Sequence, residues 1–375
     1  MIKDVYITET NCITPIGFDV SANIKSIGNE VSGIQLHDKP KLLNIPFYAS
    51  IIDDAHLDLA FAKVTSDKNF SKLEKMMILA LEPIIKKSKV VQDKRTGFIL
   101  STTKGNVTAL ENQNIEPAYL NQLAQKVADF FEFKVEPIVV SNACVSGIAA
   151  VSVAKRLIQA DMYDNVFIVA GDEVSKFVLS GFNSFQAMSD SPCKPYSINR
   201  NGVTLGEASA AVLVSSNIEN AKIKIIGDGS INDANHISGP SRTGEGLYRS
   251  IQSALAEAQN STQIDYISAH GTATPFNDEM EAIALNRLGL ENVPVNSFKG
   301  FYGHTLGASG LLETVIGIQS VLESKLFVSL GFDVIGVSQP INVIKKNQDK
   351  DILYFLKTAS GFGGSNTAVV FEKVN

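Results

Sequence analysis

The sequence lacks the features that mark several large protein classes. Its 375 residues contain only three cysteines, Cys12, Cys144 and Cys193, which are too few and too scattered for a disulfide framework or a zinc site. Sparse cysteine is typical of a reducing compartment, so we expect a cytoplasmic protein with no structural metal. No run of 18 or more apolar residues is present, which predicts no membrane-spanning helix. The first residues, MIKDVYITETNC, include no apolar signal-peptide segment.

An excess of positive charge is also missing. Lysine and arginine total 33 against 39 acidic residues, a formal net charge of −6, and this balance argues against nucleic-acid binding. Glycine and proline occur at ordinary frequencies, so a fibrous or disordered chain is not expected. Apolar residues make up 45% of the chain, enough for a large core. The length suggests two domains or one large fused unit.

Short β-branched runs alternate with longer helical stretches along the chain, a pattern that favours an α/β fold with parallel or mixed sheets. Strands are predicted over 5–11, 96–103, 137–143, 165–172, 209–216, 221–230, 264–271, 293–298 and 352–360, and helices over 70–87, 115–131, 145–160, 243–259 and 304–324.

The two halves of the chain resemble each other at one place. PIVVSNACVSGIAAVSVAKRL and VPVNSFKGFYGHTLGASGLLETVIGI both run from a strand through a short loop into an apolar helix rich in small residues. A helix that is apolar all round is a buried one. We therefore predict a duplicated α/β unit with these two helices back to back. The boundary falls in the polar stretch near residue 218, giving units of residues 1–218 and 219–375.

Cys144 is placed where a predicted strand meets a predicted helix. The N-terminus of a helix carries partial positive charge and free N–H groups, which can lower the pKa of a thiol and hold a developing oxyanion. A buried structural cysteine is the competing interpretation, and the residues alone leave both open. Cys12 and Cys193 have no such setting and are interpreted as structural.

Two of the five histidines stand beyond strands of the second half, where α/β folds commonly bind ligands. His270 ends a strand in ISAHGTATPFND, and His304 lies between a glycine-containing loop and a helix in KGFYGHTLGASG. Lys299 precedes His304 by five residues, and a buried lysine there needs a carboxylate, which Glu281 or Glu313 could supply. Helix capping and a surface ion pair are the alternative for the charged residues near these histidines.

Taken together, five segments resemble the elongating β-ketoacyl-acyl-carrier-protein synthases of fatty acid and polyketide synthesis, with Cys-His-His chemistry. They are SNACVSG, GFNSFQAMSD followed by KPYSINRNGVTLGEA, AHGTATPFND, NSFKGFYGHTLGASG and GFGGSNTAVVFE, in that order. The resemblance spans most of the chain. It implies a thiolase-like fold of two βαβαβαββ halves in five layers, α-β-α-β-α, and usually a dimer.

The resemblance also implies a role for each matching residue. Cys144 would carry the acyl chain, with its own N–H and that of Phe362 as oxyanion hole, and His270 and His304 would stabilise the enolate formed when malonyl-acyl-carrier protein loses carbon dioxide. Lys299, paired with Glu281, would hold the histidines, and no cofactor beyond the phosphopantetheine of the carrier protein is needed. Further implied roles are loop ordering for Asp278, pantetheine binding for Thr272 and Thr274, a gate for Phe362, and an acyl pocket near Asn106, Phe182 and Met188.

Partners follow from the same resemblance. An acidic acyl carrier protein would meet a positive patch, for which Lys63, Lys68, Lys72 and Lys75 are candidates, although a solvated charged face is the competing interpretation. A homodimer is expected, and the active member of a heterodimer stays open. The chain is short for the family and has GEASA where GEGA is commoner, which leaves substrate length and partner choice undecided and fits a specialised polyketide or polyene enzyme.

Other members of the superfamily fit less well. A thiolase would use a second cysteine in its last glycine loop, whereas here that loop is GFGGSN. Initiating ketosynthases and plant-type polyketide synthases use Cys-His-Asn, and a non-catalytic chain-length-factor subunit typically replaces the cysteine. A cysteine hydrolase would not need the second histidine or the long apolar helix that follows Cys144.

Overall fold

The computed structural model describes residues 3–234, 239–259 and 263–374. Their largest sheet is mixed and has 11 strands in the order β13-β11-β10-β15-β16-β9-β1-β8-β6-β4-β5, and two small sheets, β12-β14 and β2-β3-β7, lie apart from it in the pairing. The order contains the same block twice. In β5-β4-β6-β8-β1 and in β11-β10-β15-β16-β9, the first three strands are parallel and the last two are each antiparallel to their neighbour. Antiparallel pairing of β1 with β9 joins the blocks. The predicted duplication is confirmed.

The bounds of the elements follow the chain. The first half contains β1 (Tyr6–Ile13), α1 (Val20–Gly28), β2 (Ile34–His37), β3 (Phe47–Ser50), α2 (Asp54–Phe61), α3 (Lys72–Ser88), β4 (Thr96–Ser101), η1 (Val107–Asn112), η2 (Glu116–Ala118), α4 (Leu120–Phe130), β5 (Ile138–Val140), α5 (Ser146–Gln159), β6 (Asn165–Asp172), α6 (Lys176–Ser184), β7 (Leu205–Gly206) and β8 (Ala208–Ser215). The second half contains β9 (Ile223–Asn232), α7 (Glu245–Glu257), β10 (Tyr266–Ser268), α8 (Pro275–Arg287), β11 (Pro294–Asn296), α9 (Lys299–Tyr302), η3 (Leu306–Ala308), α10 (Ser309–Leu322), β12 (Lys325–Leu326), β13 (Asn342–Val343), β14 (Gln348–Asp349), β15 (Tyr354–Gly361) and β16 (Ser365–Lys373).

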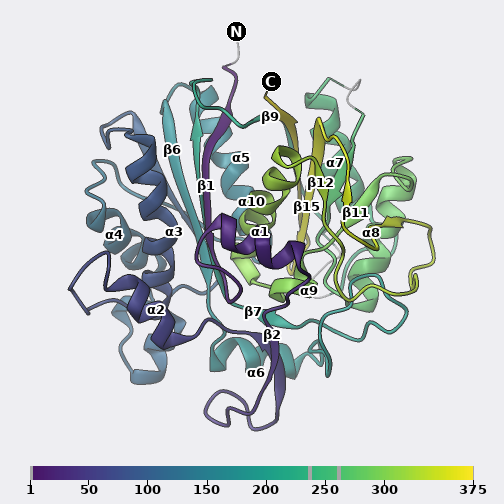
Figure 1. Ribbon diagram of the computed structural model, residues 1–375, viewed down its shortest axis with the longest axis horizontal. Coiled ribbons are helices and arrows are strands. Elements are labelled where there is room, and N and C mark those ends of the chain that lie inside the picture. Colours follow the sequence, from purple (N-terminus) through teal and green to yellow (C-terminus); the bar gives the residue numbers. More distant parts are fainter. Residues whose placement is uncertain (1–2, 235–238, 260–262, 375) are drawn as a thin grey trace.

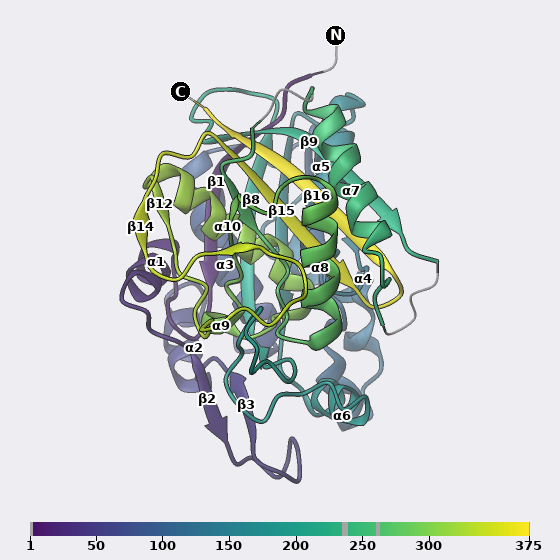
Figure 2. The ribbon, with the colours of Figure 1, turned by 90° about the vertical axis from the view of Figure 1, so that its right-hand side faces the viewer.

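Helices sandwich the strands in five layers, as predicted. Helices α3 and α4 cover the outer face of the first block, and α5 and α10 lie between the two blocks (Figure 1). Helices α7 and α8 cover the outer face of the second block and face the viewer in Figure 2, with α3 behind. The sheet is therefore covered on both sides, which explains why its strands are apolar runs rather than alternating ones.

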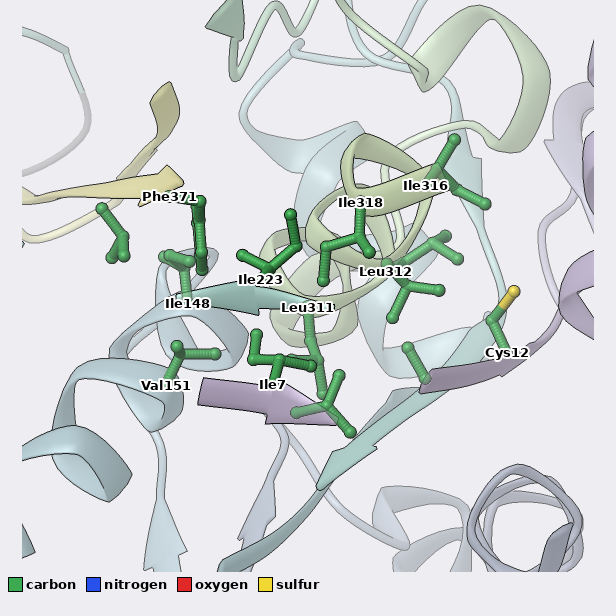
Figure 3. Close-up of a cluster of buried hydrophobic side chains, with 14 of the residues drawn as sticks. Ile7, Cys12, Ile148, Val151, Ile223, Leu311, Leu312, Ile316, Ile318 and Phe371 are labelled. Carbon is green, nitrogen blue, oxygen red and sulfur yellow. The ribbon is translucent and has the colours of Figure 1, made fainter. Parts of the chain in front are cut away.

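The central helices pack at unusually short range. A Cβ placed on Gly147 of α5 would lie 2.7 Å from the backbone nitrogen of Leu311, and one on Gly310 of α10 would lie 2.7 Å from that of Ile148. Glycine is therefore required on both sides of the crossing. Around it, Ile148, Leu311 and their neighbours form the buried apolar cluster drawn in Figure 3. This contact fixes the N-terminal ends of both helices relative to each other.

We expect Gly310→Ala to destabilise the protein by about 2 kcal/mol, because a methyl group here meets backbone that cannot move aside. Gly181→Ala in α6 is the matched control, since nothing lies within 4 Å of its added Cβ, and alanine at a helix position should be neutral or slightly stabilising. Urea unfolding measures both. Equal midpoints for the two variants would contradict the close crossing.

The predicted helix over 115–131 is wrong in its first turn. Glu116–Ala118 forms the 3₁₀ turn η2, and α4 begins only at Leu120. The predicted helix over 304–324 likewise begins later, at Ser309, because His304 precedes the 3₁₀ turn η3. Strand β16 was not predicted. Within the residues that the structure describes, no helix is long and apolar enough to cross a bilayer.

Candidate active site

The nucleophile candidate sits on a tight turn between β5 and α5. Ala143 has φ +43°, in the left-handed region, and the turn is closed by Ser146, whose hydroxyl accepts from Asn142 N (2.8 Å) and donates to Ala143 O (2.6 Å). The turn places Cys144 two residues before the first residue of α5. A side chain at this position lies beside the free N–H groups of a helix N-terminus.

The thiol of Cys144 is buried, with 8% of the residue exposed. Burial raises its pKa to about 11, while Lys299 and Lys104 act in the opposite direction. The helix N-terminus does not make Cys144 a low-pKa thiol in the free enzyme, because desolvation of the thiolate outweighs the nearby positive groups. The backbone N–H of Phe362 also acts to lower the pKa of this thiol, so a donor lies close to the reacting atom.

The structure brings Cys144, His270 and His304 together from three distant segments. The sulfur and one ring nitrogen of each histidine all lie within 4.8 Å of one another. The two imidazole rings meet edge to face, with centroids 5.2 Å apart and planes at 85°. All three residues are buried. One small group bound here would contact the thiol and both imidazoles at once.

Hydrogen bonds fix the tautomer of each imidazole. The Nδ1 atom of His304 accepts from the backbone N–H of Leu306 (3.2 Å) and also lies 2.9 Å from Ser309 Oγ. The Nδ1 atom of His270 lies 3.4 Å from Lys299 Nζ, and an ammonium can only donate. Each neutral ring therefore carries its proton on Nε2. The site thus offers two N–H donors, as an oxyanion requires.

Both imidazoles are held neutral. Burial, followed by the charge of Lys299, lowers the pKa of His270 and of His304 well below 6.5. We expect the ring signals of these two histidines in NMR to stay those of neutral imidazole from about pH 8 to about pH 6, because a lowered pKa moves the charged form to lower pH. His270→Asn and His304→Asn assign the signals. A midpoint above 6.5 for either ring would contradict the electrostatics of the site.

Behind the histidines lies a fully buried ion triad. Glu313 pairs through one oxygen with Lys299 and through the other with Lys357, both at 2.6 Å. Lys299 also donates to the carbonyl of His270 at 2.6 Å. The predicted pairing of Lys299 with Glu281 is wrong, and Glu313 is the partner. Lys357 was missed by the sequence analysis, although a lysine inside the apolar run ILYFLKTAS was a signal that a carboxylate must lie nearby.

Glu281 and Asp278 instead organise the loop that follows β10. Glu281 accepts from the backbone N–H groups of His270 (2.8 Å) and Gly271 (2.6 Å), and Asp278 accepts from that of Thr272 (3.0 Å). Burial, reinforced by Glu281, raises the pKa of Asp278 to about 7. These acids hold the backbone on which His270 is mounted.

Asp172, a buried acid at the end of β6, is the second residue that the sequence analysis missed. It accepts from the Thr102 hydroxyl (2.8 Å), the Thr103 backbone (3.0 Å) and, across the two halves, the Gly307 backbone (2.7 Å). Burial raises its pKa. The carboxylate fixes the loop before α10, and with it His304, relative to the first block. Its position at the end of an apolar strand was the available signal.

A cavity of about 440 Å³ opens onto the thiol and the two imidazoles. Aromatic rings form one wall, since Phe362 stacks on Phe182 at 5.9 Å and meets Phe185 at 6.0 Å between centroids. Thr272 and Thr274 also line the cavity, with their hydroxyls 2.9 Å apart. The cavity is therefore lined by both aromatic rings and hydrogen-bonding hydroxyls, which suits an acyl chain carried on an amide-containing arm.

Four sequence candidates lie elsewhere. Asn106 is buried against Glu74 and Ser71 and does not line the cavity with Cys144, so its predicted place in the acyl pocket is wrong. Met188 packs into a neighbouring apolar cluster, outside that cavity lining. Lys72 is held by Asp54 and Glu207, both at 2.8 Å, and Lys75 by Asp58 at 2.6 Å; neither is free for docking.

A thiol and two imidazoles also form a donor set that zinc accepts. Here the surroundings favour an anion instead. Lys299 and Lys357 both lie close enough to lower the pKa of the imidazoles. Their positive charge opposes binding of a metal ion. The same charges attract a carboxylate or an enolate.

Comparison with known proteins gives a consistent result. The family model described as "Beta-ketoacyl synthase, N-terminal domain" matches residues 3–219, and "Beta-ketoacyl synthase, C-terminal domain" matches residues 222–333. A protein of Schizosaccharomyces pombe named as a mitochondrial 3-oxoacyl-(acyl-carrier-protein) synthase is 28% identical over 99% of each chain.

Two further relatives extend the comparison. The 3-oxoacyl-(acyl-carrier-protein) synthase 2 of Staphylococcus aureus is 31% identical over 62% of this chain and 60% of its own. A solved ketosynthase in complex with its chain length factor, from Xenorhabdus doucetiae, superposes with a TM-score of 0.85 at 23% identity, covering 99% of this chain and 98% of that one. At that identity, the superposition shows a shared fold.

Proposed function

Because the chain belongs to the β-ketoacyl synthase family, whose members condense acyl groups, we propose that it joins an acyl chain held on Cys144 to malonyl-acyl-carrier protein with loss of carbon dioxide. The observation that carries the residue assignment is the cluster of the Cys144 sulfur and the two histidine nitrogens within 4.8 Å, inside a cavity of about 440 Å³. A nucleophile and two oxyanion donors in one cavity are what such a reaction requires.

In the first step, the sulfur of Cys144 attacks the thioester carbonyl of an acyl-carrier protein. The oxyanion lies between the backbone N–H groups of Cys144 and Phe362, the second of which is close enough to the sulfur to lower the pKa of the thiol. The C–S bond to pantetheine breaks, and the proton lost by Cys144 ends on the departing pantetheine thiol. An acyl-enzyme results. Because the free thiol has a high pKa, little thiolate is present before the substrate binds. The rate of this step therefore depends mainly on how the thioester is positioned against these two donors.

In the second step, malonyl-carrier protein places its thioester oxygen against the Nε2–H groups of His270 and His304. The C–C bond to the carboxylate breaks and carbon dioxide departs. The electron pair of that bond moves into the enolate. Because the two imidazoles are neutral, they do not form an ion pair with the malonyl carboxylate in the bound substrate. Their hydrogen bonds to the thioester oxygen therefore strengthen as the enolate forms, which stabilises the transition state more than the substrate. The enolate carbon then attacks the acyl carbonyl, and the Cys144 thiolate leaves and takes up a proton from solvent.

Partners are part of the same proposal. Thr272 and Thr274 line the cavity and are positioned to hydrogen-bond the pantetheine arm of an acyl carrier protein. Lys63 and Lys68 are exposed and remain candidates for docking its acidic surface. Strand β5 ends the sheet and is only half-buried, and an edge strand of this kind pairs readily with another chain. We propose a homodimer in the cytoplasm.

Reconstitution tests the proposal. The purified chain, incubated with octanoyl-carrier protein and malonyl-carrier protein, is expected to release one carbon dioxide for each β-ketoacyl product. Product formation by this chain alone supports the homodimer. If product forms only after addition of a related subunit that lacks the cysteine, the chain is the active member of a heterodimer. If the chain neither accepts acyl groups nor releases carbon dioxide under either condition, the proposed function is wrong.

A further inference from the structure

Lys357 is a buried cation that the mechanism above does not use. It lies on β15, fully buried, opposite Ser268 of the parallel strand β10. Taking an ammonium group out of water is costly unless its hydrogen bonds and charge are satisfied. Nζ of Lys357 meets this cost with Glu313 at 2.6 Å and with the backbone carbonyls of Ser268, Ala269 and Thr358 at 3.2, 3.3 and 2.6 Å.

These contacts join Lys357 to the catalytic cluster by two routes. The carbonyls of Ser268 and Ala269 immediately precede His270 in the chain, so the ammonium holds the end of the strand that carries this imidazole. Glu313 places its other oxygen on Lys299, which in turn lies 3.4 Å from the Nδ1 atom of His270. Lys357 therefore reaches His270 through one contact on the backbone side, to Ala269, and through three successive contacts on the ionic side.

The net charge of the triad of Lys299, Glu313 and Lys357 also affects the decarboxylation step. Lys299 and Glu313 alone would be neutral together, and Lys357 makes the triad net positive. The neighbouring carboxylate of Glu281 is directed at the backbone amides of His270 and Gly271. During decarboxylation, negative charge moves from the malonyl carboxylate to the thioester oxygen beside the histidines. A fixed positive charge behind them therefore stabilises the transition state more than the bound substrate.

We propose that Lys357 is a positioning residue for the decarboxylation half-reaction, which holds the backbone before His270 and gives the triad with Glu313 and Lys299 its net positive charge. The proposal rests on the proposed function of the same site and assigns to Lys357 a part that acyl transfer does not share. In acyl transfer the oxyanion lies instead against the N–H groups of Cys144 and Phe362. Loss of Lys357 should therefore slow one half-reaction and spare the other.

The experiment measures the two half-reactions separately. Release of labelled carbon dioxide from malonyl-carrier protein is measured in a Cys144→Gln background, and octanoyl transfer to Cys144 is measured by intact-protein mass with the cysteine present. Lys357→Met is expected to slow decarboxylation about tenfold or more and acyl transfer less than about threefold. Lys155→Met is the matched control, because Lys155 is also buried and paired with two carboxylates, Asp228 and Glu257, outside the site. It should leave the ratio of the two rates unchanged.

A double variant separates charge from structure. Glu313→Gln with Lys357→Met leaves Lys299 as the one charge of the triad and so restores its net positive charge, without a half-paired buried carboxylate. Its decarboxylation is expected to exceed that of Lys357→Met. Equal losses in the two half-reactions, or a double variant no faster than the single one, would overturn the proposal.

Misfolding of Lys357→Met and failure of the proposed function can each be recognised separately. If Lys357→Met does not fold, Lys357→Gln replaces it, because an amide loses the charge and can still donate to the backbone carbonyls before His270. A ratio of decarboxylation to acyl transfer about tenfold below the parent's supports the proposal, and an unchanged ratio overturns it. Failure of the proposed function is a separate result, because it appears in the Cys144→Gln parent with Lys357 intact as an absence of carbon dioxide release.

Discussion

Cys144→Ala is expected to lose acyl transfer and condensation by a factor of about 10⁴ or more, since no other group can form the acyl-enzyme. Of the other two cysteines, both are buried and neither lines the cavity. Burial raises the pKa of both thiols, but it is their place outside the cavity that keeps them from competing as nucleophiles. Transfer of an octanoyl group from its carrier protein, followed by intact-protein mass, measures the effect.

Cys12→Ala is the control for that measurement. Cys12 lies in the apolar core beside the central helices (Figure 3), so its loss should lower stability by about 1 kcal/mol without lowering acyl transfer per folded molecule. If Cys144→Ala still condensed at the parent rate, the nucleophile would have been misassigned.

Removal of either catalytic imidazole is the second large effect. In the Cys144→Gln background, His270→Ala and His304→Ala are each expected to slow release of carbon dioxide from malonyl-carrier protein by about 10²-fold or more, the loss typical of one oxyanion donor. The reason is geometric. Each ring offers an Nε2 proton because its Nδ1 atom is already occupied, by Leu306 N in one case and by Lys299 in the other.

His37→Ala provides the comparison. His37 lies on β2, where its Nε2 atom contacts the carbonyl of Ala49 at 3.1 Å, and it is not part of the cavity lining. It should leave decarboxylation unchanged. A His304 variant as active as the His37 variant would show that the enolate is stabilised elsewhere.

Much of the fold could be predicted because its signals are local. Apolar β-branched runs mark β4, β6, β8 and β15, and the small residues of α5 and α10 mark a helix crossing that only glycine allows at Gly147 and Gly310. Strand β16 was not predicted because it follows directly from the glycine turn, and its opening residues Ser365 and Asn366 are typical of a loop. The late start of α10 depends on tertiary contacts, since Thr204 and Gly206 hold the backbone of His304, and Asp172 accepts from that of Gly307.

In the site, too, features with local sequence signals could be predicted, whereas those set by tertiary contacts could not. Cys144, His270, His304 and Lys299 stand in distinctive local settings, and the structure brings them together. The partner of Lys299 could not be chosen from the sequence, because Glu281 and Glu313 are both acids on helices near it in the chain. Only the packing of α10 against β15 turns Glu313 inward, where Lys357 shares it.

The pKa of the Cys144 thiol likewise depends on the whole fold. Its place at a helix N-terminus favours a low pKa, but the completed core buries it and raises that pKa. Burial is a property of the whole fold and is not encoded in the strand–turn–helix segment alone. The same applies to the lysines ahead of α3, where Lys72 and Lys75 find acidic partners that are distant in the sequence or on another helix.

The most direct test of the account is the mass of the peptide that carries Cys144 after incubation with octanoyl-carrier protein. The account predicts an octanoyl thioester on this peptide, none on the peptides of Cys12 and Cys193, and its disappearance when malonyl-carrier protein is added. An acyl group on a different residue, or a β-ketoacyl product formed while Cys144 stays unmodified at every time point, would contradict it.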